Sequence, residues 1–291
     1  MRPLHLLAPL ATLALVAAPS DAAPMAVTNM TLSSADGFAL KGTLSMPPAK
    51  EGRKGAKAKV PVVILAHQFG ADRTGWAPLV ERLHARGIGT LALDLRGHGE
   101  STAKGGATVN VTGDFAASAK AVGFDQIPND LAQAAEWLRK QPGVDGHRIG
   151  LAGSSIGAFS VLMAGPAVKP VAILSLSPAG SVAFGEGALG KLKEAVVRAR
   201  ATSLILASSG DKEAFENTSA LKDLPGVALN IKDGDEHGFA YLKERADLMA
   251  VFFGEYLAYH HTGEVVVASK KADTPGNVIN EKTLAEKKPT D

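Results

Sequence analysis

A serine flanked by glycines is the residue whose surroundings most clearly suggest chemistry. It is Ser155, in the segment Gly153-Ser154-Ser155-Ile156-Gly157. An apolar stretch at 147–153 precedes this segment and a helical pattern follows it, so we expect Ser155 in a sharp turn between a buried strand and a helix. Flanking glycines permit such a turn, because the helix passes close to the strand. The alternative interpretation is a glycine turn without chemistry.

A serine hydroxyl is a weak nucleophile until a base removes its proton, and an imidazole oriented by a carboxylate can serve as that base. Both groups follow Ser155 in the chain. Asp211 comes after the apolar stretch 203–208, and His237 comes after the stretch 227–232. We therefore predict Ser155 as the nucleophile, His237 as the general base and Asp211 as the acid that orients the imidazole.

Other histidines and acids are weaker candidates for these roles. Five histidines lie in the N-terminal segment, in or at the end of predicted helices, or at the start of a strand: His5, His84, His147, His260 and His261. Two more follow predicted strands but precede the serine, namely His67 and His98. The three acids next to His237 are expected to be solvated loop residues, Asp233, Asp235 and Glu236.

Acyl transfer also needs hydrogen-bond donors for the oxyanion that develops on the substrate, and backbone amides commonly supply them. One donor should be the amide of Ile156, directly after the nucleophile. The other should come from the loop His67-Gln68-Phe69-Gly70, which follows the apolar stretch 60–66. We favour the Phe69 amide over that of Gln68, and expect His67 to hydrogen-bond the loop backbone.

These residues are distributed over a pattern of apolar strands and helices. An antiparallel hairpin is expected at 26–45, turning around Ala35-Asp36-Gly37. Alternating strands and helices then predict an α/β fold of one domain, with a mostly parallel central sheet and helices on both faces. Ligands bind such sheets beyond the carboxyl ends of the strands. The expected strands are 60–66, 89–95, 147–153, 170–177, 203–208 and 227–232, and the expected helices are about 75–86, 129–140, a helix after Ser155, 187–199 and 240–259.

Five motifs in this order resemble the α/β-hydrolase superfamily, especially its small dienelactone-hydrolase-like and serine esterase members. They are HQFG at 67–70, DLRGHGES at 94–101, GSSIG at 153–157, GD at 210–211 and HGF at 237–239. The resemblance covers about residues 26–260 and implies the α/β-hydrolase fold. It also assigns Asp94, Arg96 and His98 mostly to the architecture of a loop beside the site.

Two departures from that family limit what the resemblance implies. Dienelactone hydrolases use a cysteine, and this chain has none, so that specific activity is not expected. The stretch 178–202 is too short for a full cap domain, so none is expected. The segment 102–126 is rich in glycine and alanine, which supply few anchoring side chains, and we expect it to be a mobile flap.

The composition of the chain excludes several classes of partner and site. The 291 residues carry a net charge of only +2, which argues against a nucleic-acid partner. With no cysteine, the chain has no disulfide and no Cys-ligated metal, and the predicted reaction needs neither a metal nor an organic cofactor. Trp76 and Trp137 are expected to pack in the core, so no aromatic stacking platform is predicted.

The two ends of the chain differ from its middle. Residues 1–22 combine Arg2, an apolar run and small residues at Ser20 and Ala22, which predicts a signal peptide. Residues 23–261 form the predicted hydrolase domain, and residues 262–291 a flexible polar tail. We expect a periplasmic or secreted protein without stable membrane insertion after cleavage.

The sequence thus predicts a serine hydrolase that cleaves a carboxylic ester of a small or medium substrate through an acyl-enzyme. Two alternatives stay open: a peptidase or amide hydrolase with the same triad, and a noncatalytic envelope-binding protein on the same fold. The substrate and the oligomeric state are not predicted.

Overall fold

Eight strands form one sheet in the order β1-β2-β4-β3-β7-β8-β9-β10. The computed structural model describes residues 25–49 and 58–258. The first strands, β1 and β2, pair antiparallel as the predicted hairpin, and β2 joins β4 antiparallel, whereas all the other pairs in this sheet are parallel. The strands are β1 (Ala26–Ser33), β2 (Ala39–Met46), β3 (Val60–Ala66), β4 (Gly89–Leu93), β7 (Val144–Ser154), β8 (Ala172–Leu176), β9 (Thr202–Ser208) and β10 (Val227–Lys232).

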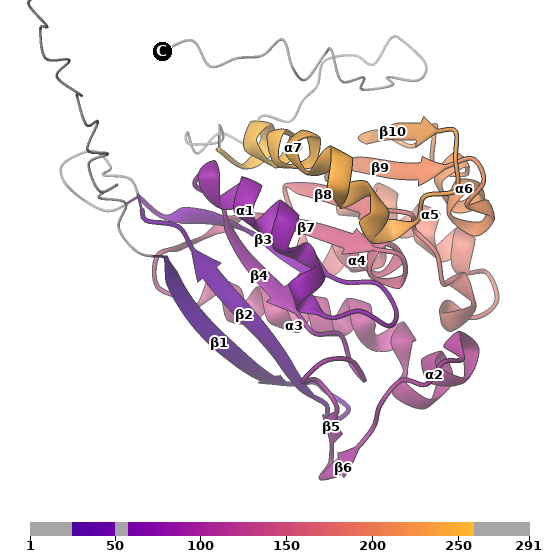
Figure 1. Cartoon of the computed structure of the whole chain (residues 1–291), viewed down its shortest axis with the longest axis horizontal. Helices are drawn as coiled ribbons and strands as arrows, with labels where there is room; N and C mark the ends of the chain where they lie inside the picture. The colour runs from indigo at the N-terminus through magenta and orange to yellow at the C-terminus, as the bar shows by residue number, and fades with distance from the viewer. Residues whose placement is uncertain (1–24, 50–57, 259–291) are drawn as a thin grey trace, which may run out of the picture.

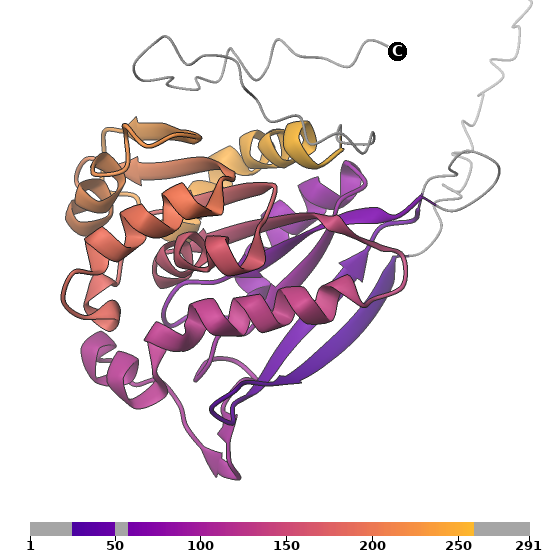
Figure 2. The ribbon, with the colours of Figure 1, turned by 180° about the vertical axis from the view of Figure 1, so that it is seen from behind.

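Helices cover both faces of the sheet. Helices α1 (Ala77–Ala85) and α7 (Leu242–Phe253) pack together on the face toward the viewer in Figure 1. Three helices cover the opposite face, which Figure 2 turns to the front: α3 (Ile127–Arg139), α4 (Ile156–Val168) and α5 (Ala188–Ala199). The predicted fold, a mostly parallel sheet with an antiparallel start and helices on both faces, is confirmed.

The apolar pattern of each element explains its place. All residues of β3 are buried, because helices cover both of its faces. Helix α4 is apolar on all sides and packs between α3, α5 and the sheet. Trp76 is fully buried and Trp137 is partly buried against the core, so both pack as expected. No described helix is long and apolar enough to cross a membrane.

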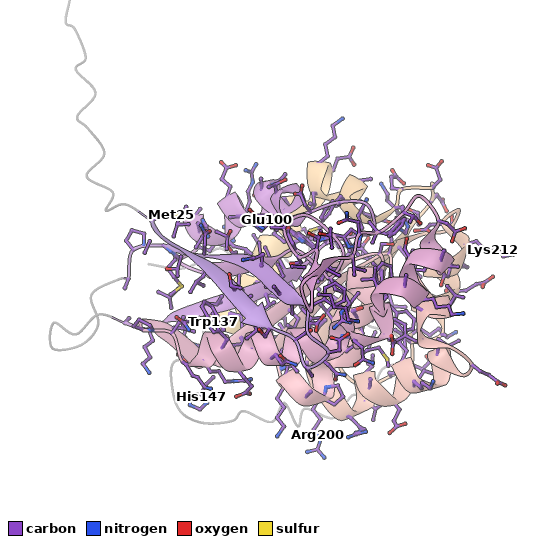
Figure 3. The ribbon with its side chains drawn as sticks, turned by 90° about the horizontal axis from the view of Figure 1, so that it is seen from below. Met25, Glu100, Trp137, His147, Arg200 and Lys212 are labelled. Carbon is purple, nitrogen blue, oxygen red and sulfur yellow. The ribbon has the colours of Figure 1, made fainter. Side chains whose placement is uncertain are left out.

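The strand registers bring the predicted site residues to one edge. Ala66 of β3 pairs with Gly153 of β7, so the loop at 67–70 begins beside the serine turn. Ser208 of β9 likewise pairs with Lys232 of β10, so the segments that carry Asp211 and His237 leave the sheet side by side. In Figure 3, Lys212, the neighbour of Asp211, lies at the opposite end of the molecule from Met25.

The segment 102–126 contains short secondary structure that was not predicted. It holds a small hairpin, β5 (Ala103–Lys104) with β6 (Ala107–Thr108), which projects at the bottom of Figure 1, and then helix α2 (Phe115–Val122). The side chains of Val122 and Phe124 are fully buried. Two of the few large apolar side chains in this segment are therefore anchored in the core, and the expected mobility of the segment stays a prediction.

Short elements complete the described chain. Helix α6 (Lys212–Ser219) was not predicted, and only the 3-10 turn η4 (Ser181–Phe184) and α5 lie between β8 and β9, where no cap domain is found among the described residues. The remaining turns are η2 (Arg73–Trp76), η3 (Phe124–Gln126), η5 (Gly238–Tyr241) and the π-helical turn η6 (Gly254–Ala258). The predicted signal peptide and polar tail lie outside the described residues.

Candidate active site

Ser155 occupies a strained turn between β7 and α4. Its backbone has φ 55° and ψ −117°, a conformation that costs a non-glycine residue about 1–3 kcal/mol. Glycines make the turn possible on both sides. A Cβ at Gly153 would lie 2.2 Å from the carbonyl oxygen of Gly157, and a Cβ at Gly157 would lie 2.3 Å from that of Ala66. The strain is held by the fold around it, since the Ser155 amide donates to the Leu176 carbonyl at 2.9 Å.

Asp211 and His237 meet beyond the ends of β9 and β10. The distance between His237 Nδ1 and Asp211 Oδ2 is 2.6 Å. The carboxylate is mostly shielded, with 13% of its side chain exposed, whereas 38% of the imidazole is exposed. A carboxylate that accepts from Nδ1–H fixes the tautomer and leaves Nε2 free to accept a proton.

The loop that carries His237 packs directly on the serine turn. Gly238 has φ 54°, and a Cβ there would lie 2.5 Å from Ser154 Oγ. The Gly238 amide donates to Ser177 Oγ at 3.0 Å. Among the described residues no hydrogen bond joins Ser155 Oγ to His237, and contacts between nucleophile and base are often long before substrate binds.

The Gln68 side chain bridges the same two segments. Its Oε1 accepts from Ser154 Oγ at 2.9 Å and from the Phe239 amide at 2.9 Å. From the sequence, only the backbone amide of Gln68 is a candidate for a role in the site. No sequence motif marks the role of its side chain, because the partners lie far away in the chain.

His67 holds the loop at 67–70 as expected. Its Nε2 accepts from the Leu95 amide at 2.9 Å, so Nδ1–H donates to the Gln68 carbonyl at 2.7 Å. Burial is the main cause that lowers the pKa of His67 to about 4, so the imidazole is neutral at pH 7. The prediction that His67 hydrogen-bonds the loop backbone is confirmed.

The backbone amides that are candidate oxyanion donors have no hydrogen-bond acceptor among the described residues. The Gly70 amide donates to His98 Nε2 at 3.2 Å, but no acceptor is found within the described chain for the amides of Gln68, Phe69 and Ile156. These N–H groups can therefore serve a ligand. The contacts do not separate Gln68 from Phe69, so the preference for Phe69 stays a prediction.

The loop at 94–101 is held by buried charges. Asp94 accepts from the amides of Arg73 at 2.9 Å and Glu100 at 2.8 Å, and it pairs with the Arg73 guanidinium. Arg96 is buried and donates to both oxygens of Asp130, at 2.7 and 2.8 Å. These contacts are the architectural ones expected of the loop.

His98 belongs to the same architecture. Because its Nε2 accepts from Gly70, its Nδ1–H donates to the Arg96 carbonyl at 3.0 Å. Burial lowers the pKa of His98.

Glu236 differs from the solvated acid that was expected. It is half-buried and accepts from Lys232 Nζ at 2.5 Å and from Ser208 Oγ at 3.2 Å. Ser208 Oγ also lies 2.6 Å from the buried Tyr241 hydroxyl, and burial raises the pKa of Tyr241. Asp233 and Asp235 are exposed, as expected.

Helix α6 connects the candidate acid to the loop after β8. Glu213 Oε1 accepts from the amides of Gly180 at 2.9 Å and Ser181 at 2.8 Å, and from the Ser181 hydroxyl at 2.7 Å. Asn217 donates to the Pro178 carbonyl at 3.0 Å. The helix that begins after Asp211 therefore also holds the chain that passes beside Ser155.

Aromatic rings gather next to the candidate oxyanion loop, although no platform was predicted. The Phe69 ring centroid lies 5.2 Å from that of Phe115 and 6.1 Å from that of Phe124, in edge-to-face contacts. A Cβ at Gly180 would lie 2.9 Å from Phe115 Cζ and 2.8 Å from Ile156 Cδ1. Phe115 of helix α2 and Ile156, the residue after Ser155, thus both lie beside Gly180.

The described residues contain no group of three or more histidines and acids that could hold a metal ion. A model of the alpha/beta hydrolase family matches residues 63–281. The chain belongs to this alpha/beta hydrolase family. The predicted resemblance is thereby confirmed, and solved structures agree with it.

Three solved structures share the fold of this chain. A dienelactone hydrolase from Anabaena variabilis ATCC 29413 is 21% identical, with a TM-score of 0.57 over 80% of this chain and 99% of its own. Acetyl xylan esterase 1 from Thermoanaerobacterium sp. JW/SL YS485 is 19% identical, with a TM-score of 0.60 over 80% and 84%. Est1E from Butyrivibrio proteoclasticus, solved with ferulic acid, is 19% identical, with a TM-score of 0.58 over 79% and 99%. No curated protein sequence matches the chain significantly.

Proposed function

We propose that this protein hydrolyses carboxylic esters of small or medium size through an acyl-enzyme on Ser155. The observation that carries the proposal is the 2.6 Å contact between Asp211 and His237, on a loop that packs against the strained serine turn. A nucleophile, an oriented base and free amide donors are the components that acyl transfer needs.

In the proposed reaction, His237 Nε2 takes the Ser155 proton while Oγ attacks the ester carbonyl. Asp211 stabilises the resulting imidazolium, and the amides of Phe69 and Ile156 donate to the oxyanion. Collapse of the tetrahedral intermediate breaks the bond to the leaving alcohol, which receives the proton from His237. Water then attacks the acyl-enzyme with the same proton transfers, releases the acid and restores Ser155.

The names of the structural neighbours support an ester substrate. Two of the three solved relatives are an acetyl xylan esterase and a protein with ferulic acid bound. The third is a dienelactone hydrolase, but this chain has no cysteine to place at the nucleophile position. An oxygen nucleophile and a simple ester substrate therefore fit this chain best.

Hydrolysis of 4-nitrophenyl esters from acetate to palmitate tests the proposal. We expect turnover by the wild type, and a loss of nearly all turnover in Ser155→Ala with an unchanged circular dichroism spectrum. A wild type that is silent on esters but reacts with a fluorophosphonate would indicate an amide or peptide substrate. A wild type that neither turns over nor reacts would favour the noncatalytic binding protein.

We also propose that the protein acts in the periplasm or outside the cell. The support is the sequence of residues 1–22, with a basic start, an apolar run and a small-residue cleavage site. Mass spectrometry of the protein from its native host should find a mature N-terminus at Ala23, and an intact Met1 in a cytoplasmic fraction would contradict the proposal.

A further inference from the structure

One side chain joins three parts of the candidate site. Gln68 lies in the loop after β3, Ser154 ends β7, and Phe239 follows β10 in η5. We infer that the Gln68 carboxamide is a positioning residue, which sets the imidazole of His237 relative to the Ser155 hydroxyl. The inference rests on the proposed function and adds a residue that the triad and the oxyanion donors do not include.

The two hydrogen bonds to Gln68 Oε1 come from residues one and two positions away from the reacting groups in the chain. Ser154 Oγ donates at 2.9 Å from the residue before the proposed nucleophile, and Ser154 is fully buried. The Phe239 amide donates at 2.9 Å from two residues after the proposed base. One oxygen atom thus fixes the distance between the segment that carries Ser155 and the segment that carries His237.

Steric contact reinforces these hydrogen bonds. A Cβ at Gly238 would lie 2.3 Å from Gln68 Oε1 and 2.5 Å from Ser154 Oγ. Only a residue without a side chain, in the left-handed conformation found here, lets the backbone approach so closely. The Gln68 carboxamide therefore also limits how far the histidine loop can move toward the serine turn.

The backbone of Gln68 is held as firmly as its side chain. Its carbonyl accepts from His67 Nδ1 at 2.7 Å and from the Ala71 amide at 3.2 Å. The next residue is Phe69, whose amide is the proposed oxyanion donor. A shift of Gln68 would therefore disturb the oxyanion donor and the histidine loop together.

Loss of the Oε1 acceptor should affect turnover more than substrate binding. Ser154 Oγ and the Phe239 amide would lose their partner, and the loop that carries His237 would relax. Because the proposed proton transfer needs close alignment, a displacement of about 1 Å can reduce the rate about 100-fold. Substrate contacts made elsewhere would persist, so KM should change little.

The decisive experiment compares Gln68→Leu with Gln68→Glu on whichever 4-nitrophenyl ester the wild type cleaves. Leucine has a similar size and accepts no hydrogen bond, whereas glutamate keeps an oxygen that can accept from both donors. We expect kcat of Gln68→Leu, per site titrated with fluorophosphonate, to fall about 10- to 100-fold with KM within about threefold.

Gln68→Glu should recover most of the lost turnover and shift the pH profile. A carboxylate beside the histidine loop favours the imidazolium, so the acidic limb of kcat/KM should move to higher pH. If Gln68→Leu proves unstable, Ser154→Ala removes one of the two donors and should lower kcat by a smaller factor with the same unchanged KM.

Two results would overturn the inference. One is a kcat of Gln68→Leu, or of Ser154→Ala if Gln68→Leu is unstable, within about twofold of the wild type per titrated site. The other is a Gln68→Glu variant as slow as Gln68→Leu with an unshifted pH profile. In both results the wild type still hydrolyses the ester. The proposed function fails in a different way: either the wild type does not hydrolyse esters, or its hydrolysis does not depend on Ser155.

Discussion

The Tyr241 hydroxyl lies 2.6 Å from Ser208 Oγ, beneath the loop that carries His237. Ser208 Oγ also donates to Glu236, the residue before the imidazole. Tyr241→Phe deletes one buried hydroxyl, so we expect a loss of about 1 kcal/mol in the free energy of unfolding. We also expect a fall of a few-fold in kcat, because the support of the loop is weakened.

Urea denaturation and steady-state kinetics measure both effects. Tyr256→Phe is the matched control, since Tyr256 packs on Phe252 in the last helical turns. Equal effects of the two substitutions on kcat would contradict the supporting role of Tyr241.

The acid of the proposed triad has an exposed counterpart that serves as its control. Asp211→Asn removes the carboxylate that orients the His237 imidazole, so kcat should fall about 10³- to 10⁴-fold. Asp233→Asn, at an exposed acid that accepts from Ser209 Oγ at 3.3 Å, should change kcat little. An Asp211→Asn variant with wild-type kcat would show that Asp211 does not take part in the reaction.

Stability should depend on pH through His67. Because burial lowers its pKa to about 4, the folded state binds no proton there between that pH and the ordinary histidine value of about 6.5, whereas the unfolded chain does. The stabilisation is therefore complete above pH 6.5 and is lost as the pH falls toward 4, by about 3 kcal/mol in total for this group.

Urea denaturation at several pH values between 7 and 4 measures that loss. His67→Asn should flatten the dependence of the unfolding free energy on pH, whatever its effect at pH 7. His147→Asn, at an exposed histidine labelled in Figure 3, should leave the slope unchanged. A steep slope that survives in His67→Asn would assign the acid sensitivity to other groups.

The position of Phe115 on α2 predicts which acyl groups the site accepts. Phe115 Cζ and Ile156 Cδ1 both lie close to Gly180, and Ile156 directly follows the proposed nucleophile. Phe115→Ala should open space there and raise kcat/KM for hexanoate relative to acetate by about tenfold. Lys120→Ala, at an exposed position of the same helix, should leave the ratio unchanged. The same acyl profile in both variants would show that Phe115 does not contact the acyl chain.

Much of this fold could be predicted from the sequence, because its strands are short, apolar and separated by helices. The stretches at 60–66 and 227–232 are observed as β3 and β10 with these bounds. Helix α6 was missed because its eight residues, KEAFENTS, carry no extended apolar pattern. The anchoring of 102–126 was missed because Val122 and Phe124 acquire their packing partners only in the folded chain.

Some contacts of the candidate site could also be predicted from the sequence, and others could not. The contact between Asp211 and His237 was predicted from chain order and strand ends, and the structure contains it. The roles of Gln68 and Glu213 could not be predicted, since a single polar side chain in a loop has no periodic pattern. Such contacts depend on which loops the strand order brings together.

The hydrogen bond between Phe239 and Gln68 spans 171 residues. During synthesis, the ribosome must therefore complete nearly the whole domain before this contact can form. A nascent chain that ends before residue 237 lacks the proposed base and the donor for Gln68, although the strands up to β10 are already present. The proposed hydrolysis would thus begin only once translation and folding of the chain are almost finished.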